Sequence, residues 1–393
     1  MRTLLVTGPG GSGRTTVAAA AALAAARGGS RTLVLSADRT DTLGAVLGVP
    51  VGAAATEVRQ GLAAVRTAPD ETFRDDLLAL QRRAGSALDL LGADRLADDE
   101  LTPLPGSEEL ALLRALRDAA EGAHGTYDTV VVDLPPTPRA LAVLALPEQL
   151  RRYLRRLLPP ERQAARALRP MLGRLAGVPM PATWLYETAE RWGGELAAVQ
   201  GVIESPDTTV RLVAEPSPAG SDAVRLSRAG LALHALRTDP LTANRLLPDA
   251  PSDPWLAGLG AQQQKALGEW EQEYGRVDRV RHLGRDPRGT DDLAALGVAA
   301  PGPAPAAAEW PVVQGEPGSE APYVWHIPLP GAVREELGLI RRGDELVVTV
   351  GPLRRIVPLP SALRRCTVAG AGLREGELRV RFVPDPALWP RTP

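Results

Sequence analysis

The sequence predicts an α/β domain, built on a parallel sheet flanked by helices, followed by a small all-β sandwich. Three observations support this prediction. The chain opens with an apolar strand, a glycine-rich loop and a helix in direct succession. Short apolar strand patterns then alternate with helical patterns to about residue 298, which is typical of parallel sheets with right-handed crossovers. Beyond a Pro- and Gly-rich stretch, the pattern changes to short strands separated by turn residues, as in a β-sandwich.

Length and composition limit the classes of function. A chain of 393 residues is long enough for two or three domains. The net charge of −2 gives no reason to expect a nucleic-acid partner. The N-terminal apolar run is too short for a signal peptide, and no apolar stretch is long enough to span a bilayer. We therefore expect a soluble cytoplasmic protein.

The first sixteen residues predict a phosphate-binding loop. An apolar strand at 4–7 leads into the glycine-rich loop, and an Ala-rich helix follows. Glycines allow backbone N–H groups to curl around an anion at which the helix N-terminus points. The spacing matches G-x-x-x-x-G-K-[ST] at Gly8, Gly13 and Thr15, but Arg14 occupies the lysine position. An ordinary strand-to-helix turn is the alternative.

The next elements extend the sheet and place a carboxylate at its edge. A second strand is predicted at 32–36, and a helix opens at Ser107, a capping residue followed by two acidic residues in the first turn. The stretch 127–132, which closes with three consecutive valines, predicts a buried strand that ends in Asp133. That position lies at the edge where open α/β sheets bind ligands. Asp133 is thus a candidate Mg²⁺-linked carboxylate, with an ordinary strand-end aspartate as the alternative.

A helical insert is predicted at about 151–204. Apolar residues at helical spacing between 150 and 158 predict an amphipathic helix with a basic outer face. That face carries Arg151, Arg152, Arg155 and Arg156. We expect it to be solvated; the alternative is a surface for a partner or an anionic membrane, so that any membrane contact would be peripheral.

The remaining elements complete two domains. Further strands and helices of the α/β part are predicted at 210–214, 221–236, 241–248, 253–274 and 277–296. We therefore expect an α/β domain over 1–298, a Pro- and Gly-rich linker over 299–321, and a β-sandwich over 322–393. The sandwich strands are predicted at 323–327, 345–350, 353–359, 367–368 and 378–382. The composition of the linker predicts that the two domains are separable.

Several stretches, taken in order, resemble the arsenite-pump and tail-anchored-protein-targeting ATPases, a deviant P-loop group with the loop GKGGxGK[ST]. The loop at 8–16 is similar to that motif, Ser-Ala-Asp at 36–38 to the first switch, and Asp-Leu-Pro-Pro-Thr at 133–137 to the second. Asn244 is similar to the asparagine that recognises adenine in this family. The C-terminal part resembles an α-crystallin-like (small heat-shock) domain, because residues 371–378 match A-x-L-x-x-G-x-L.

The resemblance implies ATP and Mg²⁺ as ligands, a homodimer, and a role for each matched residue. Thr15 and Asp133 would hold Mg²⁺, and Asp38 would orient or activate the attacking water. Arg14 would supply catalytic charge, and Asn244 would bind the adenine. The remaining nucleotide contacts would come from Gly8, Gly10, Gly11, Ser12, Gly13, Arg14, Thr15 and Thr16.

Two loop positions depart from the family. Pro9 stands where the family's first lysine reaches the nucleotide across the dimer, and Arg14 replaces the second lysine. Proline lacks a backbone donor, and a guanidinium is a wide planar fork rather than a compact ammonium. Loss of a transition-state cation costs on the order of a thousandfold in rate. The resemblance implies an ATP hydrolase, and these departures predict slow or impaired hydrolysis. Arg39 or Arg139 would be a substitute cation; exposed helix-end arginines are the alternative.

Cysteine and methionine content separates the family's functions. Arsenite binding requires clustered thiolates, and a zinc-bridged dimer requires C-x-x-C; the lone Cys366 supplies neither within one chain. A tail-anchor groove is typically Met-rich, but the predicted insert holds only Met171 and Met180. We therefore expect nucleotide-dependent handling of a protein client rather than arsenite export. The competing hypothesis is a non-catalytic scaffold or chaperone-like binding protein that uses the sandwich edge.

Overall fold

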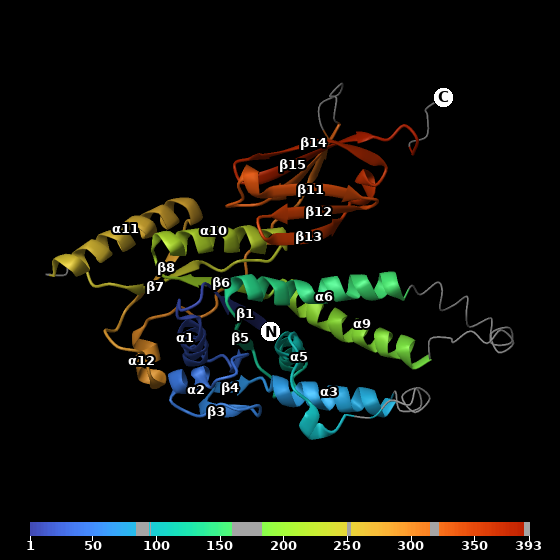
Figure 1. Cartoon of the computed structure of the whole chain (residues 1–393). Helices are drawn as coiled ribbons and strands as arrows, with labels where there is room; N and C mark the ends of the chain where they lie inside the picture. The colour runs from blue at the N-terminus through green and yellow to red at the C-terminus, as the bar shows by residue number, and fades with distance from the viewer. Residues whose placement is uncertain (84–93, 95, 159–182, 250–252, 315–321, 389–393) are drawn as a thin grey trace.

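The computed structural model describes residues 1–83, 94, 96–158, 183–249, 253–314 and 322–388. Its larger part is an eight-stranded sheet in the order β3-β4-β2-β5-β1-β6-β7-β8 (Figure 1). All neighbours pair in parallel except β3 with β4, so the predicted parallel sheet is confirmed. The strands are β1 (Arg2–Thr7), β2 (Thr32–Ser36), β3 (Thr56–Arg59), β4 (Leu62–Arg66), β5 (Thr129–Asp133), β6 (Thr208–Ala214), β7 (Leu241–Leu246) and β8 (Val277–Arg281).

Helices cover both faces of this sheet (Figure 1). One face packs against α1 (Arg14–Arg27), α2 (Thr42–Leu47) and α12 (Gly289–Ala295). The other packs against α5 (Ser107–Ala120), α6 (Thr137–Leu157), α9 (Thr183–Glu204), α10 (Pro218–Leu233) and α11 (Pro254–Tyr274). The helix α3 (Pro69–Arg83) lies against α5, and a short 3-10 turn, η1, spans Asp98–Glu100. The buried alanines of α1 lack bulk, which lets this helix approach the sheet closely.

Two helix starts differ in how they are capped. The Asp253 side chain accepts hydrogen bonds from the backbone N–H groups of Trp255 and Leu256, as a capping residue does. The prediction for Ser107 is wrong, because Ser107 is the first helical residue and its hydroxyl caps nothing. Gly106 takes the capping position with φ of +101°, a conformation that glycine adopts without strain. The two acidic residues still occupy the first turn.

The predicted helical insert continues the helix that follows β5. The helix α6 runs without interruption from Thr137 past the internal Pro147 to Leu157, and α9 packs beside it. Leu196, Val199 and Ile203 of α9 are buried against the core. Residues 159–182 of the predicted insert, with both of its methionines, lie outside the described residues. None of the described helices combines the length and apolar character that a bilayer span requires.

The C-terminal part is a sandwich of a four-stranded and a three-stranded antiparallel sheet. The larger sheet contains β9 (Val312–Gln314), β10 (Tyr323–Pro328), β14 (Cys366–Arg374) and β15 (Glu377–Pro384). The smaller contains β11 (Leu337–Arg342), β12 (Glu345–Val350) and β13 (Leu353–Pro358); 3-10 turns lie at η2 (Arg334–Glu336) and η3 (Ser361–Leu363). The A-x-L-x-x-G-x-L stretch forms the β14–β15 hairpin, with positive φ at Glu375 and Gly376. The strand β9 lies inside the stretch predicted as a linker.

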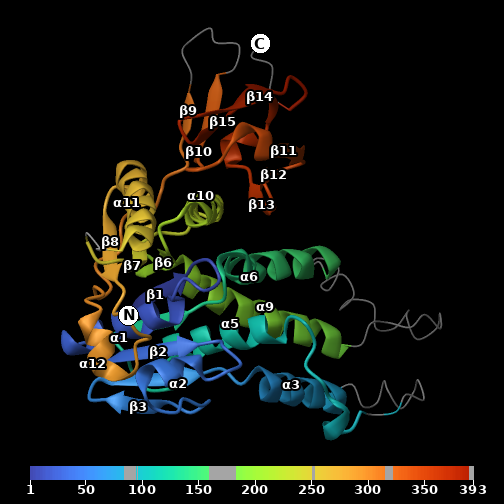
Figure 2. The same ribbon diagram turned by 60° about the vertical axis from the view of Figure 1, so that its left-hand side comes forward.

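The sandwich rests on α10 and α6 (Figure 2). Ala229 and Leu233 of α10 are buried within the sandwich core. Gly230 allows this close packing, because a Cβ there would meet Leu141 of α6 at 2.4 Å and Leu353 of β13 at 2.7 Å. The linker composition predicts separable domains, and the structure shows two parts that share packed apolar surface. We call this contact region, formed by α6, α10, β10, β12 and β13, the domain junction.

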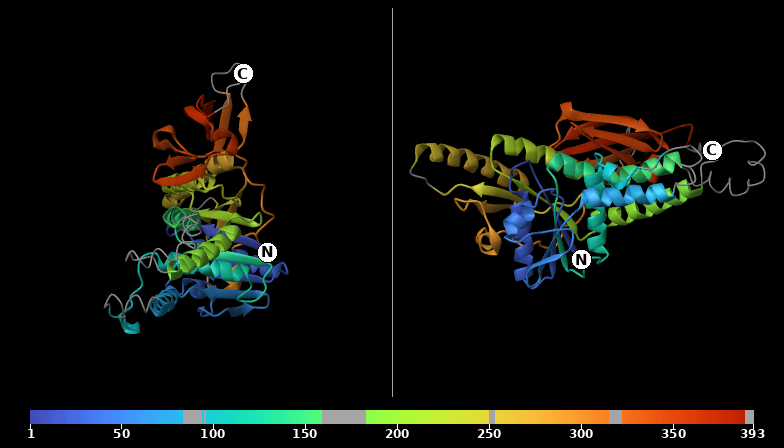
Figure 3. Two further views of the ribbon diagram at one scale, coloured as in Figure 1. Left: turned by 90° about the vertical axis from the view of Figure 1, so that its right-hand side faces the viewer. Right: turned by 60° about the horizontal axis from the view of Figure 1, so that its bottom comes forward.

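The helix α6 runs alongside the sandwich (Figure 3), and part of its basic face contacts the sandwich. Arg152 forms two hydrogen bonds to the Glu345 carboxylate of β12, at 2.9 and 2.5 Å, and Arg156 contacts the same group at 2.9 Å. The expectation of a solvated face is therefore wrong for Arg152, whose side chain is only 15% exposed, because the sequence pattern of one helix does not reveal what packs on it. Arg156 remains largely in solvent, with 63% of its side chain exposed.

Candidate functional site

The parallel register brings three predicted motifs to one edge of the sheet. Asp133 at the end of β5 lies opposite Ser36 of β2 on one side and Val6 of β1 on the other. The glycine loop follows β1, and Asp38 follows β2. These residues meet because the carboxyl ends of parallel strands share an edge.

The loop has the backbone geometry of an anion cradle. Gly11 and Gly13 have φ of +78° and +86°, and Gly8 packs so closely that a Cβ would lie 1.9 Å from the carbonyl oxygen of Val213. No side chain caps the start of α1, and no acidic residue lies in its first turn. The hydroxyl of Ser12 is buried without a hydrogen-bond partner among the described residues. The first N–H groups of α1 are thus free to bind an anion.

Asp133 is buried beside the loop, where it accepts hydrogen bonds on one oxygen only. Its Oδ2 accepts from the Thr15 hydroxyl at 2.7 Å and from the Ser36 hydroxyl at 3.1 Å. Its Oδ1 is buried and has no partner in the described part of the chain. Burial raises the pKa of Asp133 to about 6, against the opposing effects of the Thr15 hydroxyl and the Arg14 charge. A buried carboxylate with an unused oxygen fits a cation ligand.

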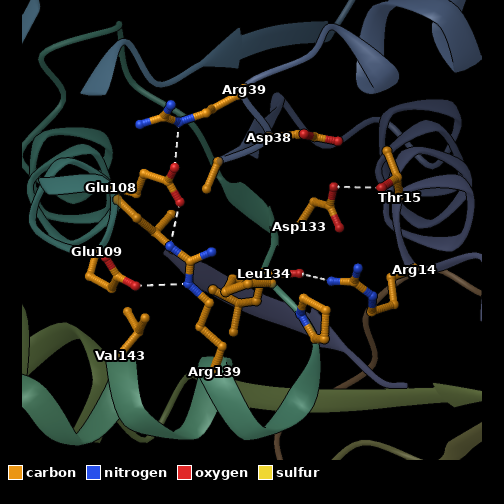
Figure 4. A pocket seen from close by; sticks show the side chains of 14 residues that line it. Arg14, Thr15, Asp38, Arg39, Glu108, Glu109, Asp133, Leu134, Arg139 and Val143 are labelled. Atoms are coloured by element: carbon orange, nitrogen blue, oxygen red, sulfur yellow. Dashed lines mark hydrogen bonds and ion pairs between the residues drawn. The ribbon is translucent and has the colours of Figure 1, made fainter. Parts of the chain in front are cut away.

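A cleft of about 290 Å³ opens over Asp133 (Figure 4). Arg14, Thr15 and Asp38 line it together with Asp133. The Arg14 guanidinium donates a hydrogen bond to the carbonyl oxygen of Leu134, so it ties the loop to the segment after β5. Burial lowers the pKa of Arg14, and the nearby Asp133 opposes that effect. Asp38 accepts hydrogen bonds from its own loop, including one from the Thr42 hydroxyl at 2.7 Å.

The two arginines considered as substitute cations are paired with acidic residues across the cleft. Arg39 contacts Glu108, and Arg139 contacts both Glu108 and Glu109. Both guanidinium side chains are about half exposed. In this arrangement the first-turn acids of α5 hold both cations away from the loop (Figure 4).

Asn244 lies on the other side of the loop. Its side-chain amide donates a hydrogen bond of 2.8 Å to the backbone oxygen of Ser12, and a Cβ at Gly13 would lie 2.3 Å from the same amide nitrogen. A second cavity of about 220 Å³ adjoins Asn244 and is lined also by Thr16, Thr42 and Arg281. The loop therefore separates two cavities, one with the carboxylates and one with Asn244.

Comparison with known proteins agrees with this geometry. The model of the family described as anion-transporting ATPase matches residues 1–297, about three quarters of the chain. The chain belongs to the anion-transporting ATPase family. Residues 320–382 match the HSP20-like domain found in members of this family, which confirms the predicted α-crystallin-like domain.

Relatives match this ATPase-family chain over nearly its full length. An uncharacterized protein of Streptomyces coelicolor is 66% identical over 392 residues, with 100% of each chain covered. A protein of Mycobacterium tuberculosis is 33% identical, covering 99% of this chain and 97% of the relative. A candidate arsenical pump-driving ATPase of Aquifex aeolicus is 26% identical, with coverage of 97% and 99%. Each of these alignments spans both the ATPase-family part and the sandwich of this chain.

The residues of this family member fit Mg²⁺ and a nucleotide phosphate. The unused Oδ1 of Asp133 and the adjacent Thr15 hydroxyl are oxygen ligands of the type that Mg²⁺ prefers. The uncapped loop offers N–H groups to phosphate oxygens. Among the described residues no group of three or more metal-ligating side chains occurs, so these two ligands would need phosphate oxygens and water to complete an octahedral shell.

Sequence reasoning missed two contributors to this ATPase-family site. Ser36 was part of the first-switch motif without a role of its own, although its hydroxyl donates a hydrogen bond to Asp133. Its position at the end of the neighbouring strand could have indicated this contact. Glu108 and Glu109 were predicted only as first-turn acids of a helix. Their pairing with Arg39 and Arg139 joins segments about 30 to 70 residues apart, and no local pattern indicates it.

Proposed function

We propose that this chain binds Mg·ATP in the cleft over Asp133 and hydrolyses it slowly. The observation that carries the proposal is the buried Asp133, with one oxygen held by Thr15 and Ser36 and the other unpartnered beside an uncapped phosphate loop. Buried polar atoms usually have a hydrogen-bond partner, so the unpartnered Oδ1 beside the loop supports a ligand that the protein itself does not supply. Membership of an ATPase family supports a nucleotide phosphate as the anion that this loop binds.

Each residue has a distinct task in this proposal. Thr15 and Asp133 would hold Mg²⁺, which supplies charge compensation to the phosphates when it is bound. The N–H groups of the loop would bind phosphate oxygens, and Asn244 would contact the base from its separate cavity. Asp38 would orient the attacking water after exchanging its Thr40 and Thr42 contacts. Positioning and charge compensation are most of what phosphoryl transfer requires of a protein.

Slow turnover follows from the loop cations. Pro9 has no cationic side chain, and the Arg14 guanidinium is engaged by the Leu134 carbonyl oxygen. Arg39 and Arg139 are each paired with α5 carboxylates, so neither is free to approach the phosphates without breaking ion pairs. In this proposal the site therefore has the groups that bind Mg·ATP but lacks part of the positive charge that stabilises the transition state.

We infer further that nucleotide state acts on a protein client through α6. This helix begins at Thr137, four residues after Asp133, and Arg152 near its other end contacts Glu345 of the HSP20-like domain. A shift of the segment 133–137 would therefore reach the domain junction along one rigid element. A homodimer is a further proposal that rests on the family resemblance, and a cytoplasmic location is one that rests on the sequence pattern.

Calorimetric titration with Mg·ATP, together with a turnover assay, tests the proposal. Asp133→Ala should abolish the Mg²⁺ dependence of binding, whereas Asp38→Ala should spare binding and remove turnover. Asp98→Ala, which alters an exposed carboxylate paired with Arg74 away from the cleft, is the matched control and should change neither. Unchanged Mg²⁺ dependence in the Asp133 variant would refute the assignment of the metal ligands.

A non-catalytic scaffold is the second candidate, and one observation favours it. Arg14 is bound to the Leu134 carbonyl oxygen and Asp38 to Thr40 and Thr42, so both groups expected to act in hydrolysis have other partners. Binding of ATP without measurable turnover in the parent and in Asp38→Ala alike would support this alternative.

A further inference from the structure

A third polar cavity lies at the opposite edge of the sheet from the phosphate loop. Its volume is about 420 Å³, and it is bounded by the amino ends of β7 and β8, by α10, and by residues 299–305. The charged and aromatic groups that line it are Arg211, Arg228, Asp239, Tyr274, Arg276 and Asp278. Three arginines therefore face two aspartates in this cavity.

The aspartates are already occupied by arginines. Asp239 accepts from Arg211 at 2.7 Å and also from Arg2 at 3.0 Å, so two guanidinium groups share one carboxylate. Asp278 pairs with Arg276, which is largely exposed at 73%. Arg211 is only 1% exposed, and its Nε is buried without a partner in the described part of the chain. The surroundings of the cavity thus carry excess positive charge.

Arg228 has no carboxylate of its own. Its guanidinium carbon stacks 4.2 Å above the centre of the Tyr274 ring, and within the described ranges it makes no hydrogen bond or ion pair. The charge of Glu273 acts on Arg228 without an ion pair, and burial is the main cause that lowers the pKa of Arg228. A partly buried guanidinium without an anion is costly, and stacking on one ring offsets only part of that cost.

We propose that this cavity binds a small molecule through an oxyanion group, with the guanidinium of Arg228 as the main contact. The excess charge around Arg211 and Asp239 favours an anion over a neutral ligand, and a guanidinium presents paired donors that match phosphate or carboxylate oxygens. The volume exceeds that of a bare phosphate, so a small phosphorylated or carboxylated compound fits. This site is independent of nucleotide binding at the loop.

The test is a calorimetric titration of the full chain with inorganic phosphate, and in a parallel arm with acetate, at constant ionic strength. Because the loop also offers N–H groups to phosphate, the titration uses Gly10→Asp, which places a negative charge in the loop at a position where a Cβ meets no atom within 4 Å. Gly10→Asp should still bind phosphate at one site. Adding Arg228→Gln should weaken that binding about tenfold or more.

Two controls separate binding from folding and from general charge loss. Arg279→Gln alters an exposed arginine of β8 that pairs with Glu271, and it should leave the affinity unchanged. Thermal melts without phosphate should show Arg228→Gln at least as stable as the parent, because the substitution removes an unpaired charge. Tighter phosphate binding would assign a phosphorylated ligand, and tighter acetate binding a carboxylate. Absence of binding of either anion to Gly10→Asp, or equal affinity with and without Arg228, would overturn the proposal.

Discussion

The cleft and the domain junction use the same arginine–glutamate chemistry in different surroundings. In the cleft, Arg39 and Arg139 pair with Glu108 and their side chains are about half exposed. At the junction, only 15% of the Arg152 side chain is exposed, and its partner Glu345 is followed in the chain by the fully buried Leu346. The charges at the junction therefore border an apolar core, and those in the cleft border an open cavity.

Because of this difference, the ion pairs have different roles in the two regions. Exposed ion pairs are worth about 0–1 kcal/mol, so the cleft pairs can exchange partners when a ligand arrives. The junction is held mainly by apolar burial, and its ion pairs fix the register of the two parts more than their stability.

The largest effect is expected from the apolar part of the junction. Leu233→Ala should lower the free energy of unfolding by about 2–5 kcal/mol, because it leaves a cavity within the sandwich core. Leu259→Ala on α11, where the side chain is 38% exposed, is the control and should cost far less. Chemical denaturation measures both. A cost for Leu233→Ala no greater than that of the control would show that the junction is loosely packed.

Removal of the sandwich tests the apolar surface that α10 contributes to the domain junction. A chain that ends at Ala300 loses the sandwich and exposes Ala229 and Leu233. We expect it to aggregate or to bind a hydrophobic dye, although the linker composition alone predicted a separable domain. A soluble, cooperatively unfolding truncated chain would contradict this expectation.

The next effect concerns the loop cations of the cleft. Arg14→Lys should raise the affinity for ATP, because a compact ammonium fits between phosphates where a guanidinium fork crowds them. Adding Pro9→Lys should raise turnover by about a hundredfold, and only in a dimer, if the remaining groups are in register. Arg27→Lys at the other end of α1 is the control. No gain in binding or turnover would favour the scaffold hypothesis.

A smaller effect follows from the pKa of Asp133. Since Mg²⁺ requires the carboxylate, Mg²⁺-dependent nucleotide binding should weaken as the pH falls through about 6. Without Mg²⁺ the pH dependence of the free energy of unfolding has the opposite sign. The folded chain binds the Asp133 proton more tightly than the unfolded chain does. The contribution of Asp133 to stability therefore decreases as the pH rises from about 4 to 6. Asp133→Asn should remove both dependences. Titrations and melts across this pH range provide the check.

The smallest effect is expected from the ion pairs of the junction. Glu345→Gln should lower the stability by about 1 kcal/mol or less, and the loss should shrink at high salt. Glu335→Gln, an exposed glutamate with no ion pair among the described residues, is the matched control. If Glu345→Gln lowers the free energy of unfolding more than Leu233→Ala does, charge rather than apolar burial holds the two parts together.

Local patterns in the sequence determined the α/β sheet, the phosphate loop and the position of Asp133. Each depends on residues close in the chain: glycines at fixed spacing, an apolar run that ends in a carboxylate, and a hairpin motif in the sandwich. The family resemblance came from the same short stretches. For that reason these features were predictable before any contact was known.

Only the tertiary structure determined which residues the charged and apolar surfaces contact. The pairing of Arg152 with Glu345 joins residues 193 positions apart, and the hydrogen bond from Asn244 to Ser12 joins residues 232 apart. Composition suggested a free sandwich, yet Leu233 of α10 completes its core. Such contacts depend on how elements pack in space, and amphipathic patterns indicate only that a face is buried or charged, without indicating what covers it.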